Sequence, residues 1–375
     1  MSHLQEKPFE YLRRKENGNK FDDAIVKNWY IARAFVLEKL EHFALRPDSK
    51  DHLHVVVADD SPLMLSVVRQ VALSAHYINY KEDVEDNSHR HRTVISLVSN
   101  NPNIKKELEK EEYLCNLPKY CKYVGLNSKP ENTNSFIDIE IHIIEHVPEN
   151  DHDENTFVFS EEDVNAFCES KKGEGVDIFN IDTLKAVYTK RMYDIGETID
   201  NLPSEDIHCA SRYTLALNVY QFEKLRIEPM PMIDEKDWEN PIIVLENISN
   251  IFCSDCFESR YLAVKLCSDG IKKEETAIWE KYNDVLSKNE HARWVVEKLI
   301  LGYSPLNKEQ HFKDESLSIN MKKRKLYRKE LKKNPQNPVH IDLCSYADLR
   351  RINPDDLKYD SFLMLAIPKI LEKVR

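Results

Sequence analysis

Three polar residues directly follow a short apolar run near the start of the chain. Residues 53–58 read LHVVVA, which is typical of a buried parallel strand, and Asp59, Asp60 and Ser61 come next. Pro62 then indicates the start of a helix, with Ser61 as its N-cap. Carboxylates at such a position can bind a divalent cation or a ribose hydroxyl, or they can simply cap the helix. These three polar residues form one candidate site.

A second group of polar residues shares one face of a long helical segment near the C-terminus. Glu290, Arg293 and Trp294 are spaced i, i+3 and i+4, Glu297 extends the same face, and His291 lies beside it. An arginine flanked by two glutamates at this spacing predicts a buried ion-pair cluster. The same helix could instead line a ligand pocket, with Trp294 stacking on a base and Arg293 meeting a phosphate.

Two cysteines in the second half of the chain form a CxxC motif. Cys253 and Cys256 would need a second, equally tight pair to make a zinc site, and no such pair occurs. A redox role would need a thioredoxin-type strand and helix around the motif, which the neighbouring residues do not provide. Buried structural cysteines are the favoured interpretation, and zinc or redox chemistry is the alternative.

The most basic stretch of the chain lies in its last quarter. Residues 321–333 read MKKRKLYRKELKK and hold eight cations against the single carboxylate of Glu330, in a chain whose formal net charge is −12. A solvated helix or a surface loop is the simplest interpretation. A contact with nucleic acid or phosphate, or docking onto an acidic protein surface, is the alternative.

Composition narrows the class of protein. The chain has 375 residues, of which 41% are hydrophobic and 31% charged, as expected of a soluble protein with more than one domain. No apolar run approaches the roughly 20 residues needed to span a bilayer, and the N-terminus is too polar for a secretion signal. Eight cysteines are too few for a disulfide scaffold, so we expect a reduced, cytoplasmic protein. Only seven glycines and no GxGxxG or Walker A motif argue against NAD(P) bound in the usual glycine-loop mode.

Hydrophobic periodicity predicts alternating strands and helices in the first half of the chain. Strands are expected at 53–58, 92–99 and 136–146, the last with one polar face, and this order is typical of a doubly wound α/β domain. A short strand, FVFS, is also expected immediately before Glu161. Helices are expected at 21–45, 61–75, 103–115, from Glu161, and at 182–199, 204–225, 272–301 and 359–374.

The last hundred residues carry several separated motifs of a known module. These are EHARW at 290–294, EK at 297–298, GY at 302–303, HIDLCSY at 340–346, KYD at 358–360 and AIP at 366–368. In this order they resemble the ryanodine-receptor repeat (RyR) domain, a mainly α-helical module. Bacterial members of that family occur alone or fused to Rossmann-like domains of the potassium-transport-regulator type. The N-terminal α/β part of this chain more distantly resembles such a Rossmann-like domain.

This resemblance implies an order of domains and a kind of ligand. The expected parts are an N-terminal helical segment (1–50), a Rossmann-like domain (51–200), a helical connecting region (201–273) and the RyR domain (274–375). The family context implies a nucleotide or ADP-ribose-like ligand. The candidate ligand-binding residues in the RyR domain are His291, Arg293, Trp294, Tyr346, Tyr359 and Asp360.

We therefore expect a cytoplasmic protein that binds a nucleotide-derived small molecule and signals to a protein partner or to a second copy, as in bacterial signalling or phage defence. Neither a membrane nor a nucleic acid is an expected partner, and no catalytic residue is assigned. One alternative is an enzyme that acts on a nucleotide or NAD through the Asp59–Asp60 loop. The other is a non-catalytic scaffold that contacts nucleic acid or protein through residues 321–333.

Overall fold

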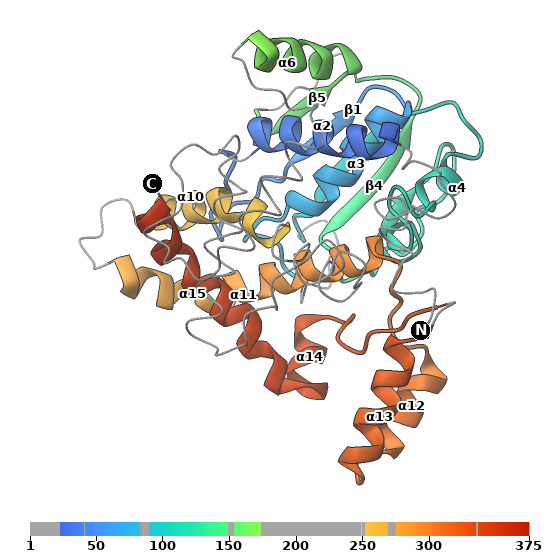
Figure 1. Ribbon diagram of the computed structural model, residues 1–375, viewed down its shortest axis with the longest axis vertical. Coiled ribbons are helices and arrows are strands. Elements are labelled where there is room, and N and C mark those ends of the chain that lie inside the picture. Colours follow the sequence, from blue (N-terminus) through green and yellow to red (C-terminus); the bar gives the residue numbers. More distant parts are fainter. Residues whose placement is uncertain are drawn as a thin grey trace.

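The structure is a computed structural model that describes residues 23–40, 42–82, 84, 90–148, 154–173, 249, 252–268, 275–334 and 337–374 (Figure 1). The expected helices at 182–199 and 204–225 lie outside these residues. Within the described ranges, no helix has both the length and the apolar character needed to cross a membrane.

A five-stranded parallel sheet forms the centre of the N-terminal half, in a mixed α/β fold. Its strand order is β3-β4-β2-β1-β5. The chain adds β2 on one side of β1 and later places β5 on the other side, so the direction of strand addition reverses at β1. The strands are β1 (His54–Val57), β2 (Thr93–Val98), β3 (Lys122–Val124), β4 (Ile139–Ile144) and β5 (Thr156–Phe159).

The first strand–helix unit forms as its sequence predicts. β1 is followed by α3 (Pro62–Ser74), whose N-cap is Ser61 and whose first residue is proline. Nearly every side chain of α3 is buried, because the helix is apolar on most of its surface. It lies beside α2 (Asp23–Leu40), and both helices cross the sheet in Figure 1.

The predicted helix at 103–115 is wrong in length. Only α4 (Ile104–Leu108) forms, and the short helix α5 (Leu117–Tyr120) follows after a turn. At 100° per residue, a continuous helix would turn Tyr113 to the side opposite Ile104. The break allows both side chains to be buried in the same core.

The C-terminal half is helical in the described residues. Its longest helix, α11 (Glu275–Ile300), crosses α15 (Leu357–Val374). Gly302 follows two residues after the last residue of α11, and its φ of +85° is the left-handed conformation predicted for this helix end. The remaining elements are α6 (Glu161–Gly173), which follows β5, and α10 (Phe257–Ser268), α12 (Lys308–Ser316), α13 (Met321–Lys332), α14 (Tyr346–Ile352) and a 3₁₀ turn at Pro354–Asp356.

One hydrophobic core runs from the sheet into the C-terminal helices. Val295, Val296 and Leu299 of α11 belong to the same buried cluster as the strand residues Val55 and Ile95. A second cluster joins α10, α11 and α15 through side chains that include Phe257, Trp279 and Met364. The hydrophobic core is therefore continuous across the expected start of the RyR domain at residue 274.

Hydrogen bonds connect the same two halves. The Asn116 amide donates to the carbonyl oxygen of Gly302 at 2.8 Å, and its backbone N–H donates to Leu299 at 3.1 Å. The Glu82 carboxylate accepts the backbone N–H groups of Tyr346 and Ala347, both at 3.0 Å, at the first turn of α14. These contacts hold the C-terminal helices against the start of α5 and the loop between α3 and β2.

Candidate functional site

Polar side chains that follow three strands, β1, β2 and β5, meet at the carboxyl end of the sheet, where the strand order reverses. Asp59 Oδ1 accepts the Ser61 backbone N–H at 2.9 Å, and Asp60 accepts a hydrogen bond from the Ser99 hydroxyl beyond β2. The Ser61 hydroxyl donates to Glu161 Oε2 at 3.2 Å, beyond β5. We call these five residues, Asp59, Asp60, Ser61, Ser99 and Glu161, the switch-point cluster.

The switch-point cluster is accessible in part and also has a structural role. Asp59, Asp60 and Ser61 are half-buried, and the Ser61 hydroxyl accepts the Met64 backbone N–H at 3.4 Å as the cap of α3. Three carboxylates at the carboxyl ends of the strands favour a ligand that donates hydrogen bonds, such as a sugar hydroxyl, and repel a phosphate. Among the residues that the structure describes, no group of three or more His, Cys, Asp or Glu side chains is arranged to hold a metal ion.

A row of polar side chains on one face of the sheet was not singled out from the sequence. His54 Nε2 and Ser96 Oγ are 2.8 Å apart on neighbouring strands, and burial lowers the pKa of His54. On β4 the buried Glu140 carboxylate is 2.5 Å from both Lys122 Nζ and His142 Nε2. The polar face expected for residues 136–146 is present, but at Glu140 it is buried and paired.

The signature residues of α11 form a buried ion-pair cluster, as the spacing predicts. Arg293 Nε lies 2.9 Å from Glu290 Oε2, and Arg293 Nη1 lies 2.7 Å from Glu297 Oε2. Arg260 from α10 lies 2.8 Å from Glu290, and Lys298 lies 2.6 Å from Glu297. Burial acts to raise the pKa of Glu290, but the charges of Arg293 and Arg260 outweigh burial and lower that pKa to about 2.

The same geometry places Arg293 inside the fold. Its side chain is 1% exposed, and its guanidinium faces Glu290 and Glu297. A guanidinium held in this way by two carboxylates has no orientation left for a phosphate. The ion-pair interpretation of Arg293 is therefore the one that its surroundings favour.

His291 is also buried, but it is uncharged. Burial lowers its pKa to about 4, and Nε2 donates to the Cys344 carbonyl oxygen at 2.9 Å. Nδ1 lies 3.7 Å from Asp360 Oδ2. Burial and the nearby charge of Glu290 raise the pKa of Asp360 well above its ordinary value, so the uncharged form of this carboxyl is favoured beside the neutral His291.

Rings surround this pair. The ring of Trp294 stacks on His291 with centroids 6.0 Å apart, and the ring of Tyr346 meets the imidazole edge-on with centroids 5.6 Å apart. His340 approaches Trp294 at 4.9 Å and Tyr303 at 6.0 Å. Burial lowers the pKa of His340 as well, so both histidines are neutral at pH 7. Four of the six candidate residues in the expected RyR domain, His291, Trp294, Tyr346 and Asp360, thus lie close together.

The raised pKa of Asp360 has a measurable consequence. A carboxyl whose pKa is raised in the folded state loses stabilising free energy as the pH rises from its unfolded pKa to its folded pKa. Asparagine has no proton to lose, so we expect Asp360→Asn to have a higher free energy of unfolding than the native chain in that pH range. The difference between the two should grow by up to about 1.4 kcal/mol for each unit by which the pH rises. Denaturant unfolding at pH 5 and pH 7 measures this difference. An equal effect at both pH values would contradict it, and the exposed Asp355→Asn is the control.

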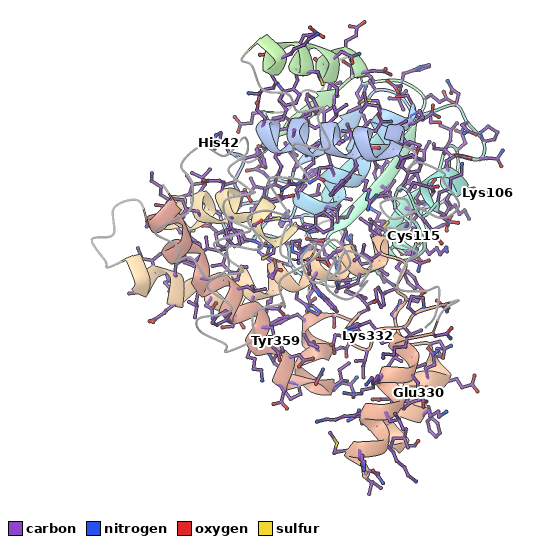
Figure 2. All side chains as sticks on the ribbon, in the orientation of Figure 1. His42, Lys106, Cys115, Glu330, Lys332 and Tyr359 are labelled. Carbon is purple, nitrogen blue, oxygen red and sulfur yellow. The ribbon has the colours of Figure 1, made fainter. Side chains whose placement is uncertain are left out.

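Tyr359 does not join the other candidates. It is 47% exposed, and Lys358 Nζ lies 5.3 Å from the centre of its ring (Figure 2). It follows the 3₁₀ turn at the start of α15, one residue before Asp360. The adjacent position in the helix turns Tyr359 toward solvent while Asp360 faces the core.

The cysteines of the CxxC motif are buried thiols next to α3. Cys256 lies 3.5 Å from the Ser74 carbonyl oxygen, and burial raises its pKa to about 12. Burial also raises the pKa of Cys253 well above its ordinary value. Between them, Asp255 accepts hydrogen bonds from Arg33 of α2 at 2.9 and 2.5 Å. The surroundings favour a structural role for both cysteines.

Some residues of these groups were missed in the sequence. Ser99 and Glu161 belong to the switch-point cluster; Ser99 is the last residue of the predicted strand 92–99, and Glu161 directly follows the predicted strand FVFS. Applying the strand-end rule to every strand, rather than to β1 alone, would have found both. Arg260 and His340 carry no comparable signal, because only the packing of α10 and of the 337–345 segment brings them to α11.

Comparisons of the chain with protein-family models, with curated proteins and with solved structures find no match in any of the three.

Proposed function

We propose that the chain is a binding protein for a nucleotide-derived small molecule, which it holds through ribose hydroxyls at the switch-point cluster. The observation that carries this proposal is the convergence of Asp59, Asp60 and Ser61 with Ser99 and Glu161 at the reversal of strand order. In open parallel sheets, ligands bind in the crevice at the carboxyl ends of the strands at such a reversal.

The charge of the cluster defines which part of the ligand it would hold. Carboxylates accept hydrogen bonds from vicinal hydroxyls, whereas a phosphate next to three carboxylates would be repelled. A nucleoside or an ADP-ribose-like molecule fits if its phosphates point away from the cluster. The glycine-loop mode of NAD(P) binding has no support in these residues.

The helix that begins at the cluster also reaches the C-terminal half. Ser61 caps the start of α3, and at the other end of this helix the Ser74 carbonyl oxygen contacts the Cys256 thiol. α3 also contacts α11. A ligand that shifts the first turn of α3 would therefore act on the helices that carry the RyR motifs. This connection supports a sensor, in which binding changes the surface offered to a protein partner.

Ligand binding to matched variants tests the proposal. We expect a saturable signal in calorimetry with adenosine or ADP-ribose, at least about tenfold weaker in Asp60→Asn, which corresponds to roughly 1.4 kcal/mol for a lost charge-assisted hydrogen bond. Glu162→Gln removes one exposed charge from the adjacent helix α6 and should bind as the native chain does. Circular dichroism confirms that each variant is folded. Binding that ignores the Asp60 substitution, or that persists with 2′,3′-dideoxyadenosine, would place the ligand elsewhere.

The same binding samples distinguish an enzyme from a sensor. The ligand recovered after prolonged incubation, with and without Mg²⁺, is analysed by chromatography. Unaltered ligand supports a sensor, and a product whose formation depends on Asp60 would replace the sensor with an enzyme that uses this loop.

A further inference from the structure

α12 and α13 form a helical hairpin that projects from the rest of the chain, at the end of the molecule away from the sheet (Figure 1). The two helices are held together by Asp314, which is 3% exposed. Arg324 Nη2 lies 2.6 Å and Arg328 Nε 2.8 Å from its carboxylate oxygens. Lys313 Nζ also lies over the ring of Tyr327, at 4.6 Å. The hairpin is thus a defined element and not merely a charged loop.

Large apolar side chains on this hairpin face solvent. Among the residues that the structure describes, seven large hydrophobic side chains are exposed, and four of them belong to the hairpin. They are Phe312 (75% exposed), Ile319 (96%), Met321 (54%) and Leu326 (58%). Ile319 and Met321 lie at the tip, where α12 gives way to α13. Exposed apolar side chains gathered on one projecting element indicate a binding surface.

The outward face of α13 adds positive charge to the same surface. Lys322, Lys325 and Lys329 are exposed and spaced i, i+3 and i+7, with Leu326 on the same face. Arg324 and Arg328 turn inward to Asp314. Glu330 and Lys332 also lie on this hairpin (Figure 2). Exposed lysines therefore alternate with exposed apolar side chains.

We infer that the α12–α13 hairpin docks on an anionic membrane surface, with Ile319 and Met321 inserted between lipid headgroups and the lysines of α13 against their phosphates. A basic helix that also presents apolar side chains is the typical design of an interfacial anchor. The basic stretch has eight cations and one carboxylate, whereas the whole chain carries a formal charge of −12, so an anionic surface repels the rest of the molecule and attracts the hairpin.

The shape and the apolar tip favour a membrane over other anionic partners. A nucleic acid would neutralise the lysines but leave Ile319 and Met321 in water. A protein partner would need a groove that matches a convex hairpin, whereas lipid headgroups accept a convex apolar tip without one. The sequence predicts no membrane partner because no segment can span a bilayer. Surface docking requires no spanning segment.

Co-sedimentation of the full chain with vesicles tests this inference. We expect binding to vesicles of equal parts phosphatidylserine and phosphatidylcholine, and none to phosphatidylcholine alone. The triple variant Lys322→Glu, Lys325→Glu, Lys329→Glu should weaken binding on the order of a hundredfold. The matched triple variant Lys106→Glu, Lys129→Glu, Lys172→Glu changes three exposed lysines of the N-terminal half by the same total charge. It should keep most of the native affinity for the vesicles.

A second variant separates a membrane from a purely electrostatic partner. Ile319→Ser with Met321→Ser keeps every charge and should still lose most of the vesicle binding. The absence of sedimentation with anionic vesicles would overturn the inference. Sedimentation that the serine variant leaves unchanged would also overturn it, and a single-stranded oligonucleotide titrated into both variants would then show whether nucleic acid is the partner. Asp60→Asn should not change vesicle binding, so this result stands apart from the proposed ligand site.

Discussion

Replacing Arg293 with methionine is expected to lower the free energy of unfolding by about 3–5 kcal/mol. The substitution keeps an unbranched side chain in the core but removes the charge that lies between Glu290 and Glu297. Both carboxylates are buried, and among the described residues Glu290 would retain only Arg260 as a cationic partner. A buried carboxylate that loses its partner must either stay charged in a poorly solvating environment or take up a proton, and both cost free energy.

Urea unfolding followed by circular dichroism measures this effect. The matched control is Arg350→Met, which removes an arginine from an exposed pair with Asp284 and should change the midpoint very little. If Arg293→Met left the midpoint unchanged but abolished ligand binding, the ion-pair interpretation would be wrong and Arg293 would belong to a ligand pocket.

Asp255→Asn is expected to have an effect of similar size, about 3–5 kcal/mol, on the stability of the whole chain. The Asp255 side chain is fully buried and accepts hydrogen bonds from the Arg33 guanidinium of α2 at 2.5 and 2.9 Å. The Gln70 side-chain amide of α3 lies 3.5 Å from the same carboxylate. One carboxylate therefore joins the N-terminal helices to the segment that precedes α10. Its neutralisation leaves a buried guanidinium facing an amide.

The number of unfolding transitions that shift in Asp255→Asn is as informative as the loss of stability. Because a continuous hydrophobic core joins the sheet to α11, we expect a single unfolding transition that shifts as a whole, seen equally by tryptophan fluorescence and by circular dichroism. Asp284→Asn, at an exposed position, is the control. Two transitions, of which Asp255→Asn moves only one, would show that the halves unfold separately and would support the expected boundary at residue 274.

Local patterns were sufficient to predict the first strand–helix unit. The β-branched run, Ser61 and Pro62 act on their neighbours in the sequence, and the structure has β1, the Ser61 cap and α3 in the expected places. The spacing of Glu290, Arg293 and Glu297 likewise placed both carboxylates beside the arginine, because residues three and four apart lie on one face of a helix.

Contacts between distant segments could not be predicted in this way. The turn after α4 exists because Tyr113 and Ile104 must reach one core, which the local periodicity of the charged segment does not reveal. The pairing of Arg33 with Asp255 spans 222 positions of the chain. The lowered pKa of His291 and the raised pKa of Asp360 depend on burial by elements that only the assembled fold brings together.

The shared core also constrains how the chain is made. A ribosome releases all five strands before α11, which begins at Glu275, so the sheet and its helices emerge before the helix that shares their hydrophobic core. Until then, the apolar surfaces of α3 and α5 that contact α11 in the finished fold lack that packing and are open to association with other nascent chains. Interactions between segments so far apart in sequence also slow folding. The N-terminal half is therefore expected to need a chaperone during synthesis until α11 has left the ribosome.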